Sequence, residues 1–313
     1  MLFLMGGHGL LKNKVVGEAA FGKAYDPHFA VDYWSAEAIL AHPDFPRARA
    51  TYFGKVLALY GDDVFLNKLL MEAVRIVAFA VAICMEAGCR PDDRETWPTI
   101  GNLKKALAPF GLASPRRIEH VVGRLVQTGY LESRLSPLDG RVRLLIPTAR
   151  MVAHDQDWLI AHYAPLAVLF GDADYRLPLS GDRQFQRVQR QAATGIFTQS
   201  AMVMLQNPDV LLFLVRDAGV LILIELARAV AERGTPIVDL SLAGLGRRFA
   251  ISRTHVRQLL LEAEARELVE IDQEQRRIGL KPRLLESLDR FIAEGMSNHD
   301  LTGAAARRRC GLA

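Results

Sequence analysis

The sequence predicts a mainly α-helical fold in which two similar units, each made of two helices and a short β-hairpin, sit on one shared helical body. Apolar residues recur at helical spacing over most of the 313 residues. Two stretches, about residues 96–150 and 236–282, break this pattern in the same order, with a capped helix, a turn and two short strands. Because the second stretch repeats the first, we expect an internal duplication.

The first unit, about residues 96–150, contains a helix that begins at Ser114 and Pro115. A serine side chain caps free amide groups at a helix start, and proline fits the first turn because its missing N–H costs nothing there. Four apolar residues at positions i, i+3, i+4 and i+7 form one stripe that is expected to be buried. They are Ile118, Val121, Val122 and Leu125. The opposite face is basic and small, so it is free to contact a partner.

A shorter helix precedes this one and a hairpin follows it. Ile100 to Ala108 has helical spacing and ends at the turn Pro109 to Leu112. The strands Tyr130 to Arg134 and Val142 to Ile146 are joined by the turn Ser136 to Gly140. The order of helix, turn, helix and two-stranded wing is that of the winged helix-turn-helix.

Thr99 to Arg150 resembles the DNA-binding core of the MarR family of bacterial regulators. The resemblance rests on two segments, Leu125-Val126-Gln127-Thr128-Gly129-Tyr130-Leu131-Glu132 and Ser136-Pro137-Leu138-Asp139-Gly140-Arg141. In that family an Asp-x-Arg at the wing tip presents the arginine to the minor groove. The resemblance therefore implies this role for Arg141, with Asp139 beside it.

The same resemblance implies a small aromatic effector, because the family includes regulators that small aromatic acids release from DNA. The aromatic residues that would line its pocket are Tyr33, Trp34, Trp97, Trp158 and Tyr163. Aromatic side chains at helical spacing more often belong to a core, which is the alternative interpretation.

The second unit, about residues 236–282, has its helix start at Ser252, 138 residues after Ser114. The apolar stripe keeps this offset and consists of Val256, Leu259, Leu260 and Ala263. The hairpin formed by Leu268 to Ile271 and Arg276 to Leu280 is smaller and lacks the Asp-x-Arg. A minor-groove contact by this wing would therefore depend on Arg276 and Arg277.

Charge is unevenly distributed along the chain. The net charge is only +4, yet Thr96 to Arg150 holds nine Lys or Arg against three acidic residues. Basic charge gathered on such a unit favours double-stranded DNA as the partner. In the first unit the candidate DNA-contacting residues are Ser114, Arg116, Arg117, His120, Arg124, Asp139, Arg141 and Arg143. In the second unit they are Arg247, Arg248, Arg253, Thr254, His255, Arg257, Gln258, Arg276 and Arg277.

The chain is expected to divide into residues 1–172, residues 173–300 and a disordered basic tail at 301–313. The first part ends with a long helix after its winged unit, and the second with a closing helix from Arg283 to Gly295. The other expected helices are Val15 to Phe21, Pro27 to Ala41, Arg47 to Tyr60, Val64 to Ala87, Thr148 to Phe170, Gln184 to Leu205 and Pro208 to Arg233. Gly171 to Asp182 has the composition of a linker. Together the two units would form an intramolecular pseudo-dimer, either monomeric or weakly dimerising.

Several classes of protein are disfavoured by composition and motifs. Three cysteines do not make a disulfide framework or a metal site, and they suit a reducing cytoplasm. Met1 to Met5 lacks the features of a signal peptide, and the apolar runs Ile76 to Met85 and Val210 to Leu226 are too short or too interrupted to span a membrane. No catalytic constellation or phosphate-binding loop stands out, so we expect neither an enzyme nor a cofactor.

The function that these observations predict is sequence-specific binding of double-stranded DNA by a bacterial transcriptional regulator. The helices that begin at Ser114 and Ser252 would enter the major groove. Two alternatives stay open, since winged helices also occur in plasmid or phage replication initiators and in scaffolds for protein contacts.

Overall fold

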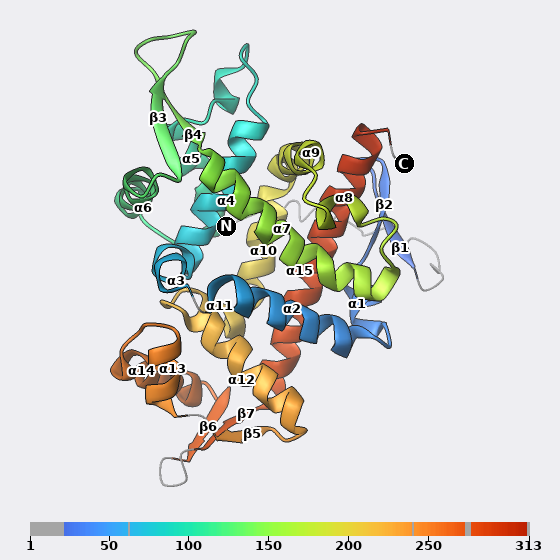
Figure 1. Cartoon of the computed structure of the whole chain (residues 1–313), viewed down its shortest axis with the longest axis vertical. Helices are drawn as coiled ribbons and strands as arrows, with labels where there is room; N and C mark the ends of the chain where they lie inside the picture. The colour runs from blue at the N-terminus through green and yellow to red at the C-terminus, as the bar shows by residue number, and fades with distance from the viewer. Residues whose placement is uncertain (1–21, 62, 240, 273–276, 312–313) are drawn as a thin grey trace, which may run out of the picture.

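The computed structural model describes residues 22–61, 63–239, 241–272 and 277–311. Over these residues the chain is mainly helical, with small antiparallel sheets, as the sequence predicts (Figure 1). The expected helix Val15 to Phe21 lies outside the described residues.

Helices form a central body from which the two units project. The body helices are α1 (Ala36–Ala41), α2 (Phe45–Tyr60), α3 (Val64–Leu70), α4 (Ala73–Ala87), α7 (Ala149–Phe170), α8 (Arg176–Leu179), α9 (Arg183–Ala193), α10 (Phe197–Leu205), α11 (Pro208–Leu214), α12 (Gly219–Arg233) and α15 (Pro282–Arg309). Short 3-10 turns lie at Arg94–Thr96, Ala108–Phe110 and Thr194–Ile196. The helix α2 packs along α7, while α15 runs through the body against α7, α9 and α10. A small hairpin of β1 (Lys23–Asp26) and β2 (Val31–Trp34) packs on α15.

The first unit contains α5 (Ile100–Leu107), α6 (Pro115–Gln127) and the antiparallel strands β3 (Leu131–Leu135) and β4 (Arg143–Pro147). The second contains α13 (Leu242–Arg248), α14 (Arg253–Ala265), β5 (Ile237–Asp239), β6 (Val269–Asp272) and β7 (Arg277–Leu280). Its sheet has the order β5-β7-β6, so it carries one strand more than the first. Each unit packs on its own apolar helix, α4 under the first and α12 under the second.

The two units share a set of backbone hydrogen bonds that fix each hairpin to its helices. In the first unit Tyr130 N donates to Leu125 O at 2.9 Å and Thr148 N to Tyr130 O at 3.0 Å. In the second unit the corresponding bonds are Leu268 N to Ala263 O at 3.0 Å and Lys281 N to Leu268 O at 3.0 Å. Each hairpin is thus joined to the helix before it in the same way.

One contiguous core joins the units to the body. The predicted stripes of α6 and α14 are buried in it, together with the apolar faces of α2, α4, α7, α12 and α15. Residues 1–172 and 173–300 therefore share a core instead of forming separate globules.

The prediction of a helix from Pro27 to Ala41 is wrong. The segment turns between β1 and β2, where Asp26 Oδ1 accepts from Phe29 N at 2.9 Å and Ala30 has a φ of 53°. Only its last six residues, α1, are helical. A side-chain hydrogen bond that favours a turn competes here with the helical spacing.

Three expected long helices are interrupted. Val64 to Ala87 breaks into α3 and α4, Gln184 to Leu205 into α9 and α10, and Pro208 to Arg233 into α11 and α12. Two of the breaks face each other, because Ala218 N donates to Met71 O at 2.8 Å. A tertiary hydrogen bond of this kind gives no local sequence signal.

The prediction of a disordered tail is also wrong, because α15 continues to Arg309 and residues 301–306 are buried. Asp300 explains this order, since it accepts from Trp34 N at 2.7 Å and from Tyr175 Oη at 2.9 Å. Arg307 and Arg308 then bind backbone carbonyls of Asp174 and of the β1–β2 turn. Tyr175 is fully buried, so the expected linker Gly171 to Asp182 is partly a packed element.

Candidate nucleic-acid interface

The helices α6 and α14 lie on the same side of the body, with the two hairpins directed towards opposite ends (Figure 1). Both helices begin with a serine cap. Ser114 Oγ accepts from Arg117 N at 3.3 Å, and Ser252 Oγ accepts from His255 N at 3.0 Å. Because the buried stripes fix the rotation of each helix, the same outward positions are presented by both.

Five arginines on the two units are exposed and make no ion pair or side-chain hydrogen bond with any described residue. They are Arg116 and Arg124 on α6, Arg247 at the end of α13, and Arg253 and Arg257 on α14. The predicted polar residues His120, Thr254 and Gln258 are exposed beside them. These eight side chains are available to a partner without breaking a described contact.

Three other predicted residues are occupied by contacts within the protein, which revises their expected role. Arg117 is partly buried and pairs with Glu72 at 2.9 Å. Arg248 pairs with the buried Glu225 at 2.5 Å, and His255 Nε2 lies 3.1 Å from Asp217 O. We therefore assign them to positioning the units instead of to contacting a ligand.

These contacts form a continuous chain of polar interactions between α6 and α14, the line from Arg117 to His255. Arg117 of α6 meets Glu72, which also pairs with Arg75 at 2.6 Å, and Arg75 pairs with Asp217 at 2.6 Å. The backbone carbonyl of Asp217 then meets His255 of α14. Sequence reasoning missed this line, because its members lie far apart in the chain and carry no motif.

The tip of the first wing is held by Asp139. Its carboxylate accepts from Arg141 N at 3.1 Å and Arg141 Nε at 3.2 Å, and from Arg94 Nη2 at 2.9 Å. The hydrogen bonds from Arg141 are the main reason that the pKa of Asp139 falls to about 2. The Asp139 side chain is 9% exposed and that of Arg141 is 90% exposed, so the aspartate orients an arginine that projects from the wing.

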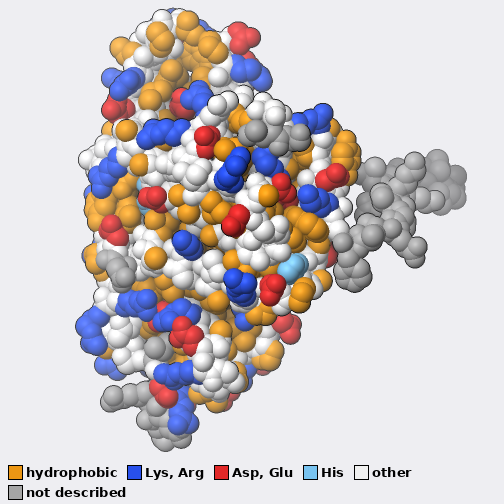
Figure 2. All heavy atoms as spheres, turned by 45° about the vertical axis from the view of Figure 1, so that its right-hand side comes forward, with side chains coloured by type: hydrophobic (Ala, Val, Ile, Leu, Met, Phe, Trp, Pro, Cys, Tyr) orange, Lys and Arg blue, Asp and Glu red, His pale blue; other side chains and the backbone are white. Residues whose placement is uncertain are grey.

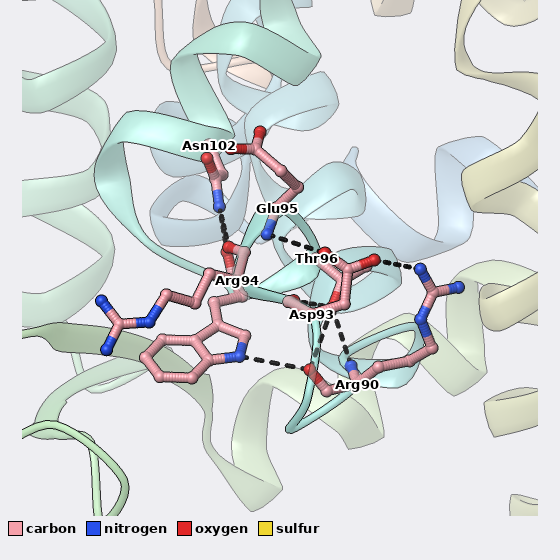
Figure 3. A network of polar contacts seen from close by, with 7 residues as sticks. Arg90, Asp93, Arg94, Glu95, Thr96 and Asn102 are labelled. Atoms are coloured by element: carbon pink, nitrogen blue, oxygen red, sulfur yellow. Dashed lines mark hydrogen bonds and ion pairs between the residues drawn. The ribbon is translucent and has the colours of Figure 1, made fainter.

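Arg94 comes from the loop before α5 and was not among the predicted residues. Figure 3 shows the loop closed by its own polar contacts, with Trp97 Nε1 donating to Arg90 O at 3.2 Å and Asn102 Nδ2 to Arg94 O at 2.9 Å. The Arg94 guanidinium also lies 5.1 Å from the centre of the Trp97 ring. A rigid loop thus buttresses the wing tip from the side.

The remaining wing arginines differ from their expected roles. Arg143 donates to Ser133 O at 3.0 Å across the first hairpin. Arg277 pairs with Asp239 of the added strand β5 at 3.3 Å, while Arg276 lies outside the described residues. The described part of the second wing therefore offers no counterpart of Arg141.

Figure 2 brings forward the side of the body that carries α15 and the β1–β2 hairpin. Basic and acidic side chains are interspersed there.

The five aromatic residues expected to form an effector pocket are not brought together. Trp34 stacks on Phe170 with ring centres 4.0 Å apart, Trp97 lies by the first wing, and Tyr163 donates to His299 O at 2.7 Å. Only Trp158 lines the large cavity described below. Among the described residues there is no cluster of metal-ligating side chains, and no helix long and apolar enough to cross a bilayer.

Comparison with known proteins gives no match: no protein family, curated protein or solved structure is significantly similar to this chain.

Proposed function

We propose that the protein binds double-stranded DNA as a transcriptional regulator, with its two units acting as tandem winged helix-turn-helix modules. In this proposal α6 and α14 enter the major groove and Arg141 reaches the minor groove. The chain is then a pseudo-dimer that supplies both recognition helices itself.

The observation that carries the proposal is the set of four unpaired arginines on the capped helices α6 and α14 at one side of the molecule, with Arg247 at the end of α13 as a fifth. Arg47 and Arg176 of the body are also exposed and make no ion pair with a described residue, but they lie on different helices, α2 and α8. Unpaired cations around a protruding helix favour a polyanion, because binding releases the counterions that DNA condenses. A scaffold for protein contacts would instead favour an apolar surface at this position.

The order of elements supports DNA over other polyanions. A capped second helix with an exposed outward face fits the major groove, and a hairpin at its end falls beside the adjacent minor groove. An oriented arginine at the hairpin tip suits the enhanced negative potential of a narrow minor groove. The line from Arg117 to His255 would fix the distance between the two helices.

The test is binding to duplexes selected from a random library, measured by fluorescence anisotropy over a salt series. We expect log K to fall linearly with log salt, by about 0.9 for each phosphate contact. The double variant Arg253→Ala, Arg257→Ala should make the fall of log K with log salt shallower by about 1.8. The matched control is Arg47→Ala, Arg176→Ala, which removes two exposed arginines of the body. Selection of no duplex, or equal losses in both double variants, would refute the proposal.

A further inference from the structure

A cavity of about 270 Å³, partly open to solvent, lies in the helical body. Its walls come from α2, α4, α7, α9, α10, α12 and α15, so it lies where the supports of the two units, α4 and α12, meet. Protein interiors are normally packed with few voids larger than a water molecule. A concave site of this size with a mainly apolar lining is the usual form of a small-molecule binding site.

Most of the cavity wall is apolar. Ile76 and Val77 of α4, Phe197 and Val203 of α10, and Phe291 of α15 line it, and each is partly buried although it belongs to the core. A dry apolar cavity of only about 150 Å³ is enough to take up benzene. The wall therefore favours a hydrocarbon or aromatic guest larger than one ring.

One end of the cavity is polar and incompletely satisfied. Gln189 is 1% exposed, and its Nε2 donates to Thr302 Oγ1 at 2.8 Å. Gln189 Oε1 and His299 Nδ1 are buried and have no hydrogen-bond partner among the described residues. Buried polar atoms are nearly always paired, so an unpaired amide oxygen on a residue that lines the cavity indicates a donor that arrives with a guest.

The cavity offers no free cation among its described lining residues. Burial lowers the pKa of His162 to about 4 and that of His299 well below its usual range, so both rings are neutral at pH 7. Arg190 is the one cation among the described lining residues, and Asp155 already holds it through Nε at 3.0 Å and Nη2 at 2.5 Å. A carboxylate would find no free cation here, unlike the aromatic acids implied by the family resemblance.

We propose that this cavity binds a small uncharged molecule, mainly apolar and cyclic, whose hydroxyl or N–H group donates to Gln189 Oε1. Trp158 and His162, stacked with ring centres 3.7 Å apart, offer the guest an aromatic surface in the same cavity. The proposal is independent of DNA binding, because the ligand is measured on the free chain.

The probes are indole, 1-methylindole, which lacks the N–H donor, and the anion indole-3-carboxylate. Isothermal calorimetry on the full chain should show indole binding, 1-methylindole binding about tenfold more weakly, and no heat from the carboxylate. The variant Gln189→Leu should bind indole and 1-methylindole with equal affinity, because the acceptor is gone.

Gly295→Leu tests the location. Gly295 lines the cavity on α15, and a Cβ there would meet no atom within 4 Å, so leucine fills the space without a clash and removes a helical glycine. The matched control is Gly54→Leu on the exposed face of α2, where a Cβ also meets nothing. We expect Gly295→Leu to abolish indole binding with no fall in Tm, and Gly54→Leu to bind as the wild type does.

Failure of indole to bind at millimolar concentration would overturn the proposal, as would unchanged binding by Gly295→Leu. Equal affinity for indole and 1-methylindole in the wild type would overturn the role of Gln189. Tighter binding of indole-3-carboxylate than of indole would overturn the preference for an uncharged guest.

Discussion

The two units have the same internal skeleton and different outer surfaces. Ser114 and Ser252 cap their helices in the same way, and the same backbone hydrogen bonds join hairpin to helix. In the first unit, however, Asp139 and Arg94 hold the tip of the wing. The second has a smaller described wing, reinforced by β5. The contacts that fold each unit are therefore alike, while the surface that would meet a ligand differs.

The second unit carries more unpaired arginines than the first, three against two. On α6 they are Arg116 and Arg124, one at each end of the helix, while Arg141 of the first wing is exposed but paired with Asp139. On the second unit Arg253 and Arg257 lie one turn apart on α14, and Arg247 lies just before it. We infer that the first unit would combine helix and wing, whereas the second would rely on its helix.

The largest expected effect tests whether the stability of both units depends on the shared helical body. Arg190 is 4% exposed and Asp155 is 1% exposed, so Asp155→Ala leaves a buried charge unpaired. The free energy of unfolding should fall by about 3–5 kcal/mol. Because both units share one core, amide exchange should quicken in both.

The control for this variant is Asp172→Ala, which removes an exposed carboxylate near the end of α7 and should change stability by less than about 0.5 kcal/mol. Loss of protection in the first unit alone would show that the two halves unfold separately.

The next largest effect tests whether the tip of the first wing contributes to DNA binding. Arg141→Ala should weaken DNA binding about tenfold, since it removes the exposed side chain that the tip presents. Asp139→Asn should act in the same direction but about threefold, because it only loosens the orientation of that arginine. Gel-shift titration measures both. Arg134→Ala on the same hairpin is the control, and an equal loss from that variant would remove the special role of the tip.

The smallest effect concerns the line that joins the units. Glu72→Gln breaks the ion pairs to Arg117 and Arg75, so the spacing between α6 and α14 should become less fixed. Affinity for the selected site should fall about threefold, and the penalty for inserting one base pair between the half-sites should shrink. Glu86→Gln, at the other end of α4, is the control. If insertion is penalised as strongly in Glu72→Gln as in the wild type, the line does not set the spacing.

Local signals made the units predictable from sequence. The serine caps and apolar stripes placed α6 and α14 closely, and turn residues placed β3 and β4. The breaks between α3 and α4 and between α11 and α12 were not predictable, since a hydrogen bond between two distant segments fixes them.

The same limit applies to the candidate site. Arg116 and Arg117 are adjacent and alike in sequence, yet one is free and the other is held by Glu72, 45 residues away. Likewise Gln189 and His299 become neighbours of one cavity only because α9 packs on α15. Which polar groups are free is a property of tertiary packing, and spacing along the chain does not report it.

The central claim is that one chain presents two different recognition helices in a fixed arrangement, and hydroxyl-radical footprinting on a selected duplex tests it most directly. The outward residues Arg116 and His120 of α6 correspond to Thr254 and Gln258 of α14, and arginine suits guanine whereas glutamine suits adenine. We expect one chain to protect a non-palindromic site with half-sites about 34 Å apart, Arg116→Ala to relax one half and Gln258→Ala the other. Two chains on a perfect palindrome, with each variant relaxing both halves equally, would contradict the account.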